Sequence, residues 1–513
     1  MSIESARRYF ALAALVTVVT SCGDAATAPA PPPPPPPPSI GTPGLKIVAG
    51  SGLTDTVDAQ PAQALVVEVR DVDGKVVPGA LVRFQSRPPS DPTRQSESAV
   101  FVCALTVATC SGSQFVADTT DSAARAKALI RLGTVAGRAV VRVTVPELGL
   151  EDSATFTVNP GAPARMNLSP RDTLLDIGGT FTIQARAADR YGNARSEVPT
   201  FSVGTGGAVT VDAASNVVTA HDMGTHAVYA HLGGITDSAA VRVLPPGRLL
   251  VWSPAAAAVR LVDINGKDEQ TLITSVGSDF GVFPRFSRTR QGITLHSATQ
   301  TTSVGPSGDA IVVDTTGTPR RDISGFSSII AVRQTDDGNV MVVGRRSGDP
   351  GWYGVFRVTA DNTITLLQTL PGFSDIYGSV DITYDGNRVA YIDGNGLAIL
   401  DVSTGALTNV VSAARSPRWS VQGDRLAYLV PATCPGELDG LPFVINADGS
   451  GGKSLTDSCF SPGLGWSPDG KYVIGRAGEG LAFRIVRVSD GVAVFFRFIS
   501  GGQFIDYYQP DWR

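Results

Sequence analysis

The sequence predicts an all-β protein in which two β-sandwiches precede a closed ring of six blades. Glycine is abundant, at 56 of 513 residues, and charged residues make up only 17%, which suits short strands joined by tight turns. Apolar and polar residues alternate over short stretches before about residue 247, and a turn pattern recurs six times after it. The net charge of −5 is mild, so we expect no nucleic-acid partner.

The first 43 residues have the features of an export signal and a spacer. Arg7 and Arg8 precede the short apolar stretch 9–19, which ends in Val19-Thr20-Ser21-Cys22. This ending resembles the lipobox of bacterial lipoproteins. The resemblance implies that 1–21 is a signal peptide and that Cys22 is lipidated, which would anchor the chain in the outer membrane, facing the periplasm or the cell surface. An ordinary cleaved signal with a chance cysteine is the alternative. The linker 22–43 contains eight consecutive prolines, which form a stiff polyproline II spacer.

Residues 44–160 and 161–246 each show the pattern of a sandwich. Leu65, Val67 and Val69 alternate with polar or smaller neighbours, and Val141, Val143 and Val145 do the same later. The run Thr120-Asp121 to Ala136-Gly137 resembles invasin-type bacterial Ig-like domains. Asp189-Arg190-Tyr191-Gly192-Asn193 and the strands after it resemble a second bacterial Ig-like family, with Phe201 where that family usually has a core tryptophan. The second resemblance implies a stalk or adhesion module.

Residues 247–513 carry the repeat. One element is a strand–turn–strand, as in Asp401-Val402-Ser403-Thr404-Gly405, and it occurs six times. The other is clearest in Gly465-Trp466-Ser467-Pro468-Asp469-Gly470, with weaker copies beginning at Pro284, Asp336, Asp381 and Pro417. The last copy, Pro510-Asp511-Trp512, is truncated, and the first segment, 248–252, has no partner before it. We expect these two ends to pair and close the ring, which removes exposed sheet edges. The repeat resembles TolB-type, WD-repeat-like six-bladed β-propellers, without the N-terminal domain of TolB.

The five cysteines fit an exported protein. Once Cys22 is set aside for lipidation, four remain, and four cysteines allow three pairings. We expect the local pairs Cys103–Cys110 and Cys434–Cys459 in an oxidising compartment.

Motifs for catalysis or metal binding are missing from the sequence. It contains no Gly-x-Ser-x-Gly elbow, no His-Glu-x-x-His helix and no phosphate loop. His221, His226 and His231 are five residues apart, so neighbours in this series would point to opposite faces of a flat strand. We expect structural or surface roles for them and for His296, and we read the Asp-Gly sites as turns rather than calcium loops. We therefore expect no enzyme, metal or cofactor.

The remaining prediction is a binding surface on the propeller. Candidate residues are Trp352 and Tyr353, which follow a loop-like Gly348-Asp349-Pro350-Gly351, and Glu437 and Asp439 within the Cys434–Cys459 segment. A packed blade edge explains the two aromatic residues equally well. The leading hypothesis is an envelope-anchored, non-enzymatic scaffold that binds a protein or glycan. A propeller-type carbohydrate-active enzyme (a lyase or glycosidase) is the alternative, which convergent acids in the channel would favour. A purely structural surface component is the third option.

Overall fold

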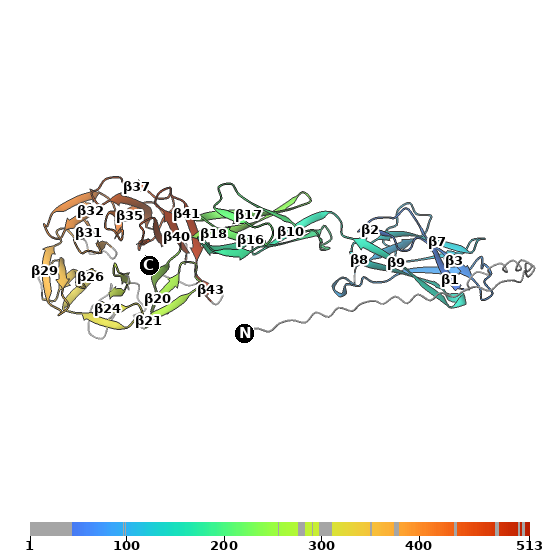
Figure 1. The fold of residues 1–513 in the computed structure, drawn as a ribbon, viewed down its shortest axis with the longest axis horizontal. Helices are drawn as coiled ribbons and strands as arrows, with labels where there is room; N and C mark the ends of the chain where they lie inside the picture. Colours follow the sequence, from blue (N-terminus) through green and yellow to red (C-terminus); the bar gives the residue numbers. More distant parts are fainter. Residues whose placement is uncertain are drawn as a thin grey trace, which may run out of the picture. The chain divides into compact units, whose positions relative to one another are not determined.

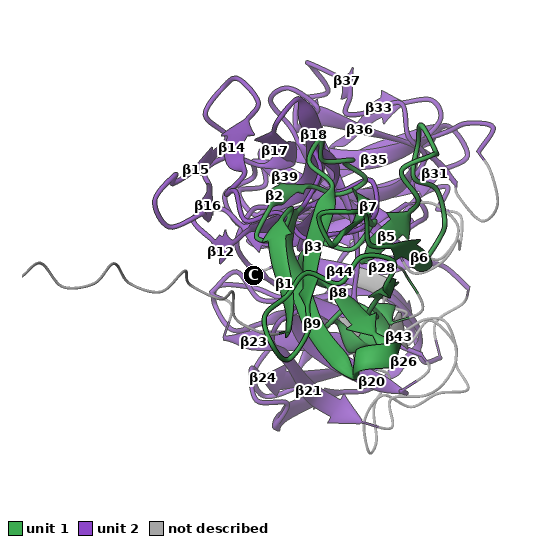
Figure 2. Ribbon diagram, turned by 90° about the vertical axis from the view of Figure 1, so that its right-hand side faces the viewer, with its two compact units in different colours: residues 1–159 green, residues 160–513 purple. Residues whose placement is uncertain are grey.

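The computed structural model describes residues 44–512 apart from 96, 98, 255, 275–282, 290, 297–309, 349–350, 374–378, 435–438, 478–481, 501–502 and 505–507. The predicted signal peptide, Cys22 and the proline spacer lie outside these residues. The described chain is built from β-strands with two short 3-10 turns, which confirms the all-β prediction. It divides into two compact units, 1–159 and 160–513 (Figure 2). No helix in the described part of the chain is long and apolar enough to cross a membrane.

The first unit consists of two sheets. One has the strand order β1-β3-β7-β5 and the other β2-β9-β8-β4-β6. Their strands are β1 (Gly44–Ala49), β2 (Thr54–Thr56), β3 (Leu65–Arg70), β4 (Leu81–Ser86), β5 (Val100–Cys103), β6 (Phe115–Thr119), β7 (Arg125–Leu132), β8 (Gly137–Val145) and β9 (Leu150–Asn159), with 3-10 turns at Pro92–Arg94 and Pro146–Leu148.

The core of the first unit follows the alternation in its sequence. Leu65, Val67 and Val69 of β3 are fully buried, and Val141 and Val143 of β8 are buried as well. Successive side chains of a strand point to opposite faces, so each of these strands places one row of apolar side chains in the interior. The sequence therefore predicted the inward faces of these strands correctly.

The second unit begins with a smaller set of sheets. The strand orders are β10-β13, β11-β18-β17-β14 and β12-β16-β15. The strands are β10 (Pro163–Ser169), β11 (Asp172–Asp176), β12 (Thr180–Thr182), β13 (Gln184–Asp189), β14 (Thr200–Val203), β15 (Val209–Val211), β16 (Val217–Ala220), β17 (Gly224–Leu232) and β18 (Ile235–Leu244). Val228, Val241 and Val243 are fully buried between them, and Phe201 is half-buried against the same cluster. We call this part the second sandwich.

The rest of the second unit is a ring of six four-stranded sheets (Figure 1). In ring order they are β44-β19-β20-β21, β22 to β25, β26 to β29, β30 to β33, β34 to β37 and β38 to β41. The strands of the first three sheets are β44 (Tyr508–Trp512), β19 (Arg248–Ser253), β20 (Ala258–Asp263), β21 (Glu269–Thr274), β22 (Arg285–Phe286), β23 (Gly292–His296), β24 (Ala310–Asp314), β25 (Pro319–Ile323), β26 (Phe326–Gln334), β27 (Val340–Arg346), β28 (Gly354–Val358) and β29 (Ile364–Thr369). Those of the other three are β30 (Val380–Ile382), β31 (Arg388–Asp393), β32 (Gly396–Asp401), β33 (Leu407–Val411), β34 (Arg415–Trp419), β35 (Arg425–Pro431), β36 (Gly440–Asn446), β37 (Lys453–Ser454), β38 (Gly465–Trp466), β39 (Tyr472–Arg476), β40 (Ala482–Arg487) and β41 (Ala493–Arg497). A short hairpin is formed by β42 (Ile499–Ser500) and β43 (Gln503–Phe504).

The two ends of the ring sequence share one sheet, as predicted. Strand β44 pairs antiparallel with β19, with Trp512 opposite Leu249 and Asp511 opposite Leu250. The C-terminal strand thus becomes the innermost strand of the sheet that the ring sequence begins. Closure in this way leaves no unpaired inner edge at the start of the repeat.

The recurrent Asp-Gly sites are hairpin turns within these sheets. In the turn between β30 and β31, Asp385 Oδ1 accepts hydrogen bonds from Thr383 Oγ1 at 2.6 Å and from the Asn387 N–H at 3.0 Å. Asp469 does the same with Ser467 and Lys471 between β38 and β39. Each carboxylate caps its own turn.

The second sandwich and the ring share a hydrophobic core. Met223 and Leu244 of the sandwich lie in one buried cluster with Leu249, Phe483 and Trp512 of the ring. Polar contacts surround this cluster: Asn265 Nδ2 donates to Asp176 Oδ2 at 2.6 Å, Arg487 Nη1 to Asp222 Oδ1 at 2.5 Å, and Arg242 Nη1 to the Phe495 carbonyl at 3.1 Å. Shared apolar burial makes the two parts one packed body.

Candidate functional site on the axis of the ring

The six inner strands each place one residue at the same position of the repeat, next to the ring axis. In most copies a Ser or Thr follows two residues later, with an aromatic residue, Gln or Ile in between. Going round the ring, these residues are Arg285, Arg333, Asp381, Arg418, Gly465 and Asp511. Five of the six are charged, and all five charged side chains are buried. Buried charges need partners, so this cluster is the most informative polar feature of the ring. We call it the axial cluster.

Asp381 is the centre of the axial cluster. Its Oδ1 accepts hydrogen bonds from Arg333 Nη2 at 2.7 Å and Arg418 Nη1 at 3.2 Å. Its Oδ2 accepts the backbone N–H of Trp419, on the next sheet, at 2.8 Å. Asp511 makes the matching contact on the opposite side of the ring, between the first and second sheets, where its Oδ2 accepts the Phe286 N–H at 2.7 Å. The two aspartates therefore join neighbouring sheets while they compensate arginine charge.

The electrostatics of the cluster follow from this pairing. Burial acts to raise the pKa of Asp381, but Arg333, Arg418 and Arg285 outweigh it and hold the pKa below its usual value. Burial likewise acts to lower the pKa of Arg333, but the charges of Asp381, Tyr384 and Asp511 and the hydrogen bond to Asp381 together outweigh it, so that this pKa is raised. Arg285 differs: burial and the charge of Arg418 lower its pKa to about 9, against the opposing charges of Asp511 and Asp381.

Several donors and acceptors in the cluster lack partners among the described residues. Arg285 is 5% exposed, and its one described hydrogen bond runs from Nη1 to the carbonyl of its neighbour Pro284. Arg333 lies over the Tyr384 ring at 4.1 Å, and its Nε and Nη1 are buried without a hydrogen bond. His296 Nδ1 is also buried and unpartnered. Such groups are uncommon in folded proteins and call for an explanation.

A small cavity adjoins these groups. It offers about 20 Å³ to water-sized groups. Arg285, His296, Asp381 and Arg418 line it, together with apolar side chains that include Phe283 and Leu464. Space of this size holds a water molecule or a group of similar size. The cavity therefore combines buried positive charge, an unpartnered imidazole nitrogen and apolar walls.

The described residues of the binding surface predicted from the sequence do not line the cavity of the axial cluster. Tyr353 is 8% exposed, packs edge-on against Phe373 at 5.0 Å and lies beneath Arg345. Of the two alternatives for this residue, its burial favours packing at a blade edge, because the apolar ring fills a gap between adjacent sheets. Trp352 is half-buried and stacks on Phe356 at 6.2 Å. Binding by Trp352 stays a prediction.

Of the two acidic residues of that predicted surface, the structure describes one, Asp439. Asp439 forms an ion pair with Arg415, and its backbone N–H donates to the Phe460 carbonyl at 2.8 Å. Glu437 lies outside the described residues, so the recognition role of this segment stays a prediction.

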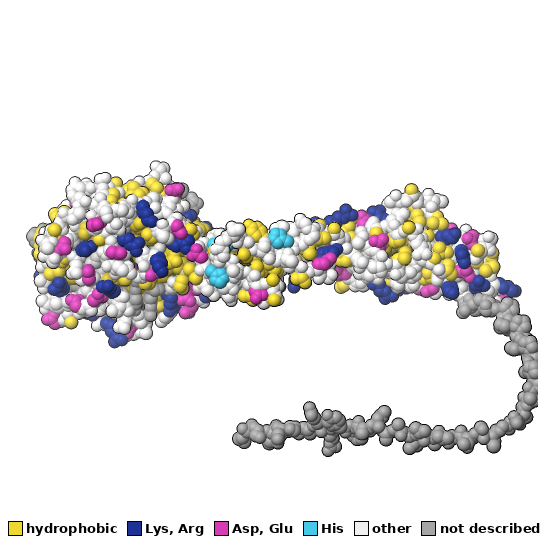
Figure 3. All heavy atoms as spheres, turned by 45° about the horizontal axis from the view of Figure 1, so that its top comes forward, with side chains coloured by type: hydrophobic (Ala, Val, Ile, Leu, Met, Phe, Trp, Pro, Cys, Tyr) yellow, Lys and Arg dark blue, Asp and Glu magenta, His cyan; other side chains and the backbone are white. Residues whose placement is uncertain are grey.

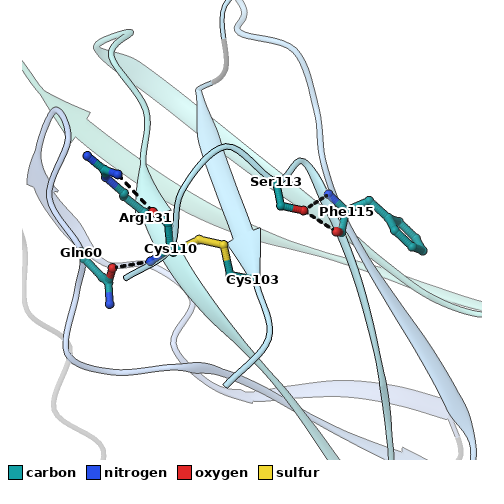
Figure 4. Close-up of a disulfide and its surroundings, with 6 residues drawn as sticks. All are labelled: Gln60, Cys103, Cys110, Ser113, Phe115 and Arg131. Carbon is teal, nitrogen blue, oxygen red and sulfur yellow. Dashed lines mark hydrogen bonds between the residues drawn. A yellow bond between two sulfur atoms is a disulfide. The ribbon is translucent and has the colours of Figure 1, made fainter. Parts of the chain in front are cut away.

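Both local disulfides are present. Cys103 and Cys110 are bonded with their Cα atoms 5.4 Å apart, and Cys434 and Cys459 with theirs 5.9 Å apart. Figure 4 shows how the first is held: Gln60 Oε1 accepts the Cys110 N–H, and Arg131 Nη1 donates to the Cys110 carbonyl. The second ties the segment between β35 and β36 to the segment that precedes β38. The predicted pairing of these four cysteines is confirmed.

The histidines of the second sandwich have separate partners. His221 contacts Thr210 at 2.8 Å, and His231 contacts Ser202 at 2.8 Å and Thr236 at 2.9 Å. In the described part of the chain, no three His, Cys, Asp or Glu side chains gather as a metal site would require. Figure 3 shows histidines at separate places, and Lys, Arg, Asp and Glu interspersed on the visible face of the ring.

The axial cluster was missed in the sequence, although a signal for it existed. Aligning the repeat copies on their Ser or Thr places Arg285, Arg333, Asp381 and Arg418 in one column. Residues in equivalent positions of a closed ring face a common axis. The copies are far apart in sequence, 48 residues for Arg333 and Asp381, so no local pattern indicates that their charges meet.

Comparisons with known proteins bear on the fold alone. No protein-family model matches the chain, and no curated protein matches it. Among solved structures, a putative TolB from Agrobacterium tumefaciens is 12% identical, with a TM-score of 0.33, over 51% of this chain and 98% of the other. A periplasmic gluconolactonase from Pseudomonas aeruginosa is 12% identical, with a TM-score of 0.34, over 52% and 98% of the two chains. These neighbours are consistent with a β-propeller, and TM-scores of this size carry no further argument.

Proposed function

We propose that this chain is an envelope-anchored, non-enzymatic scaffold lipoprotein. It displays a six-bladed TolB-like propeller, carried on two Ig-like modules, to a protein or glycan partner. Lipidated Cys22 and the proline spacer would hold the modules at the outer membrane. The observation that carries the proposal is the packed junction between the second sandwich and the ring, in which Leu244 and Met223 share a core with Leu249 and Trp512. Because the stalk module shares its core with the ring, the two form one body, and such a body suits display of the ring to a partner.

The axial cluster supports binding over glycoside chemistry. A glycosidase acid must hold its proton near neutral pH, which requires a raised pKa. Asp381 has the opposite environment: three arginines lower its pKa, and both its oxygens accept hydrogen bonds. Asp511 is engaged with the Phe286 N–H. These carboxylates are suited to holding the sheets together.

The test is affinity capture from detergent-solubilised envelope of the source organism. The bait is the ectodomain 44–513, and separate baits of 44–159 and 160–513 map the retained partner. Dividing the chain at 159 respects the two compact units, whereas a cut at 247 would split the core shared by sandwich and ring. A partner retained by 44–513 and by 160–513, but not by 44–159, supports the proposal. Retention by 44–159 alone, or by none of the baits, contradicts it.

A further inference from the structure

We propose that the cavity of the axial cluster binds a single monoatomic anion, chloride, against the guanidinium of Arg285. The ion adds the negative charge that the cluster lacks and so stabilises the closed ring. The inference goes beyond the proposed function, because an ion buried on the ring axis requires no macromolecular partner. Its test is the dependence of unfolding on the anion in solution, which is separate from the capture experiment.

The first argument is the charge of the axial cluster. Three buried guanidiniums, on Arg285, Arg333 and Arg418, face two buried carboxylates, on Asp381 and Asp511. Among the described residues of the cluster, one positive charge is thus uncompensated. Leaving a buried charge unpaired is costly, so a singly charged anion bound beside these groups stabilises the arrangement.

The imidazole that lines the cavity does not change this balance. Burial, with the charge of Arg285, lowers the pKa of His296 to about 3, so the ring is neutral at ordinary pH. Its Nε2 lies 2.9 Å from the Ile330 carbonyl, and its Nδ1 is buried. His296 therefore contributes part of the wall and no charge.

The second argument identifies Arg285 as the group that receives the anion. Arg333 and Arg418 each pair with Asp381, at 2.7 and 3.2 Å, whereas Arg285 forms no ion pair with a described carboxylate. Its Nη1 donates to the Pro284 carbonyl, and its other N–H groups form no hydrogen bond with a described residue. Unlike Nε and Nη1 of Arg333, these groups are not sealed from a water-sized neighbour, and Arg285 lines the cavity.

The environment of Arg285 also favours an anion at its side. Burial, together with the charge of Arg418, lowers the pKa of Arg285 to about 9, so the guanidinium stays charged at neutral pH although its surroundings oppose the charge. A guanidinium presents several N–H donors in one plane, and an anion in front of them accepts more than one hydrogen bond. An anion there offsets both the burial and the repulsion.

The third argument is the size of the cavity, which selects the anion. The cavity offers about 20 Å³, room for one water-sized group, so carboxylates, phosphate and sulfate are too large. Chloride is a single atom only slightly larger than a water molecule. Part of the wall is apolar, from Phe283, Val380 and Leu464, and a water molecule between these side chains and Arg285 would leave the charge unbalanced. We therefore assign the space to chloride.

The test is calorimetric unfolding of the ectodomain 44–513 in sodium chloride and in sodium methanesulfonate at the same ionic strength. Methanesulfonate is too large for the cavity, so the two salts screen charges equally and differ in the ion that can enter. At a hundredfold excess over its Kd, a bound ion raises the transition of the second unit by about 3–4 °C. We expect a rise of this size in chloride over methanesulfonate, and the rise should follow RT ln(1 + [Cl⁻]/Kd).

The first unit is the control within the same molecule. General effects of the two salts on protein surfaces act on both transitions, whereas a bound ion acts only on the unit that holds it. Arg285→Gln should remove the chloride-specific rise, because it removes the charged partner. Arg288→Gln should keep it, because Arg288 is exposed and paired with Asp336.

A second measurement keeps the test decisive if Arg285→Gln does not fold. Crystals of the wild-type ectodomain grown in bromide should show an anomalous scattering peak in the cavity beside Arg285, since bromide replaces chloride at such sites. The proposal is overturned if chloride raises the second transition no more than the first, or if Arg285→Gln keeps the full rise. A cavity without a bromide peak overturns it as well.

Discussion

Replacing Trp512 by alanine should destabilise the second unit and leave the first unit unchanged. Trp512 is fully buried in the cluster that joins β44, the neighbouring sheet and the second sandwich, and it stacks on Tyr472 at 6.1 Å. Its indole N–H has no hydrogen-bond partner among the described residues, so the substitution removes packing and no polar contact. Trp→Ala in a core costs roughly 3–5 kcal/mol.

The assay is scanning calorimetry of the ectodomain, with the isolated segment 44–159 used to assign the transition of the first unit. At roughly 1.3 °C per kcal/mol for a body of this size, the transition of 160–513 should fall by about 4–7 °C. Phe115→Ala is the matched control, because Phe115 is 51% exposed on β6 of the first unit and its loss should shift neither transition appreciably. The reasoning is refuted if Trp512→Ala moves the transition of 44–159, or leaves that of 160–513 where it was.

Three further predictions concern the anchor, the turns and the disulfides. Cys22→Ser should release the protein from the membrane fraction and abolish incorporation of labelled palmitate; a variant that stays membrane-bound and labelled contradicts lipidation at Cys22. Hydrogen bonds from Ser403 and Thr404 lower the pKa of Asp401 to about 2. This carboxylate therefore stabilises the folded state fully at pH values above its unfolded pKa of ~3.8, and the stabilisation is lost as the pH falls towards 2. Asp401→Ala should therefore lower the denaturation midpoint at pH 6 and match the wild type near pH 2, and an equal deficit at both pH values argues against the capping role. Removing the Cys434–Cys459 disulfide, whose cysteines are 25 residues apart, should lower the free energy of unfolding by about 3.5 kcal/mol through loop entropy. Removing Cys103–Cys110, whose cysteines are 7 residues apart, should lower it by about 2.4 kcal/mol. Urea denaturation of the two double serine variants measures which loss is larger, and a larger loss for Cys103–Cys110 rules out the loop-entropy account.

Much of the fold could be predicted because its causes are local. The alternation in β3 places Leu65, Val67 and Val69 on one face, since successive side chains of a strand point in opposite directions. The Asp-Gly turns form their hydrogen bonds within five residues, as around Asp385 and Asp469. Ring closure was also predictable, because an unpaired first strand and a truncated last repeat complement each other.

Other features were not predictable from local pattern. For Tyr353 the sequence left a surface position and packing at a blade edge equally open, and the neighbouring sheet covers it through Phe373. The packing of Leu244 and Met223 against Phe483 and Trp512, across the predicted boundary near residue 247, had no local signal either, and the boundary itself stays a prediction. Burial of this kind depends on which sheets become neighbours, and sequence alternation carries no information about that.

By itself, then, the sequence determined the all-β class, the inward faces of the strands, the turns and the closure of the ring. It favoured the local pairing of Cys103, Cys110, Cys434 and Cys459 among three possible pairings, and the structure settled it. Only the tertiary structure decided that Arg285, Arg333, Asp381, Arg418 and Asp511 meet, with His296, around one small cavity. The physical reason is distance along the chain. A strand or a turn is stabilised by contacts within a few residues, whereas the excess positive charge of the axial cluster exists only when sheets far apart in sequence close around a common axis.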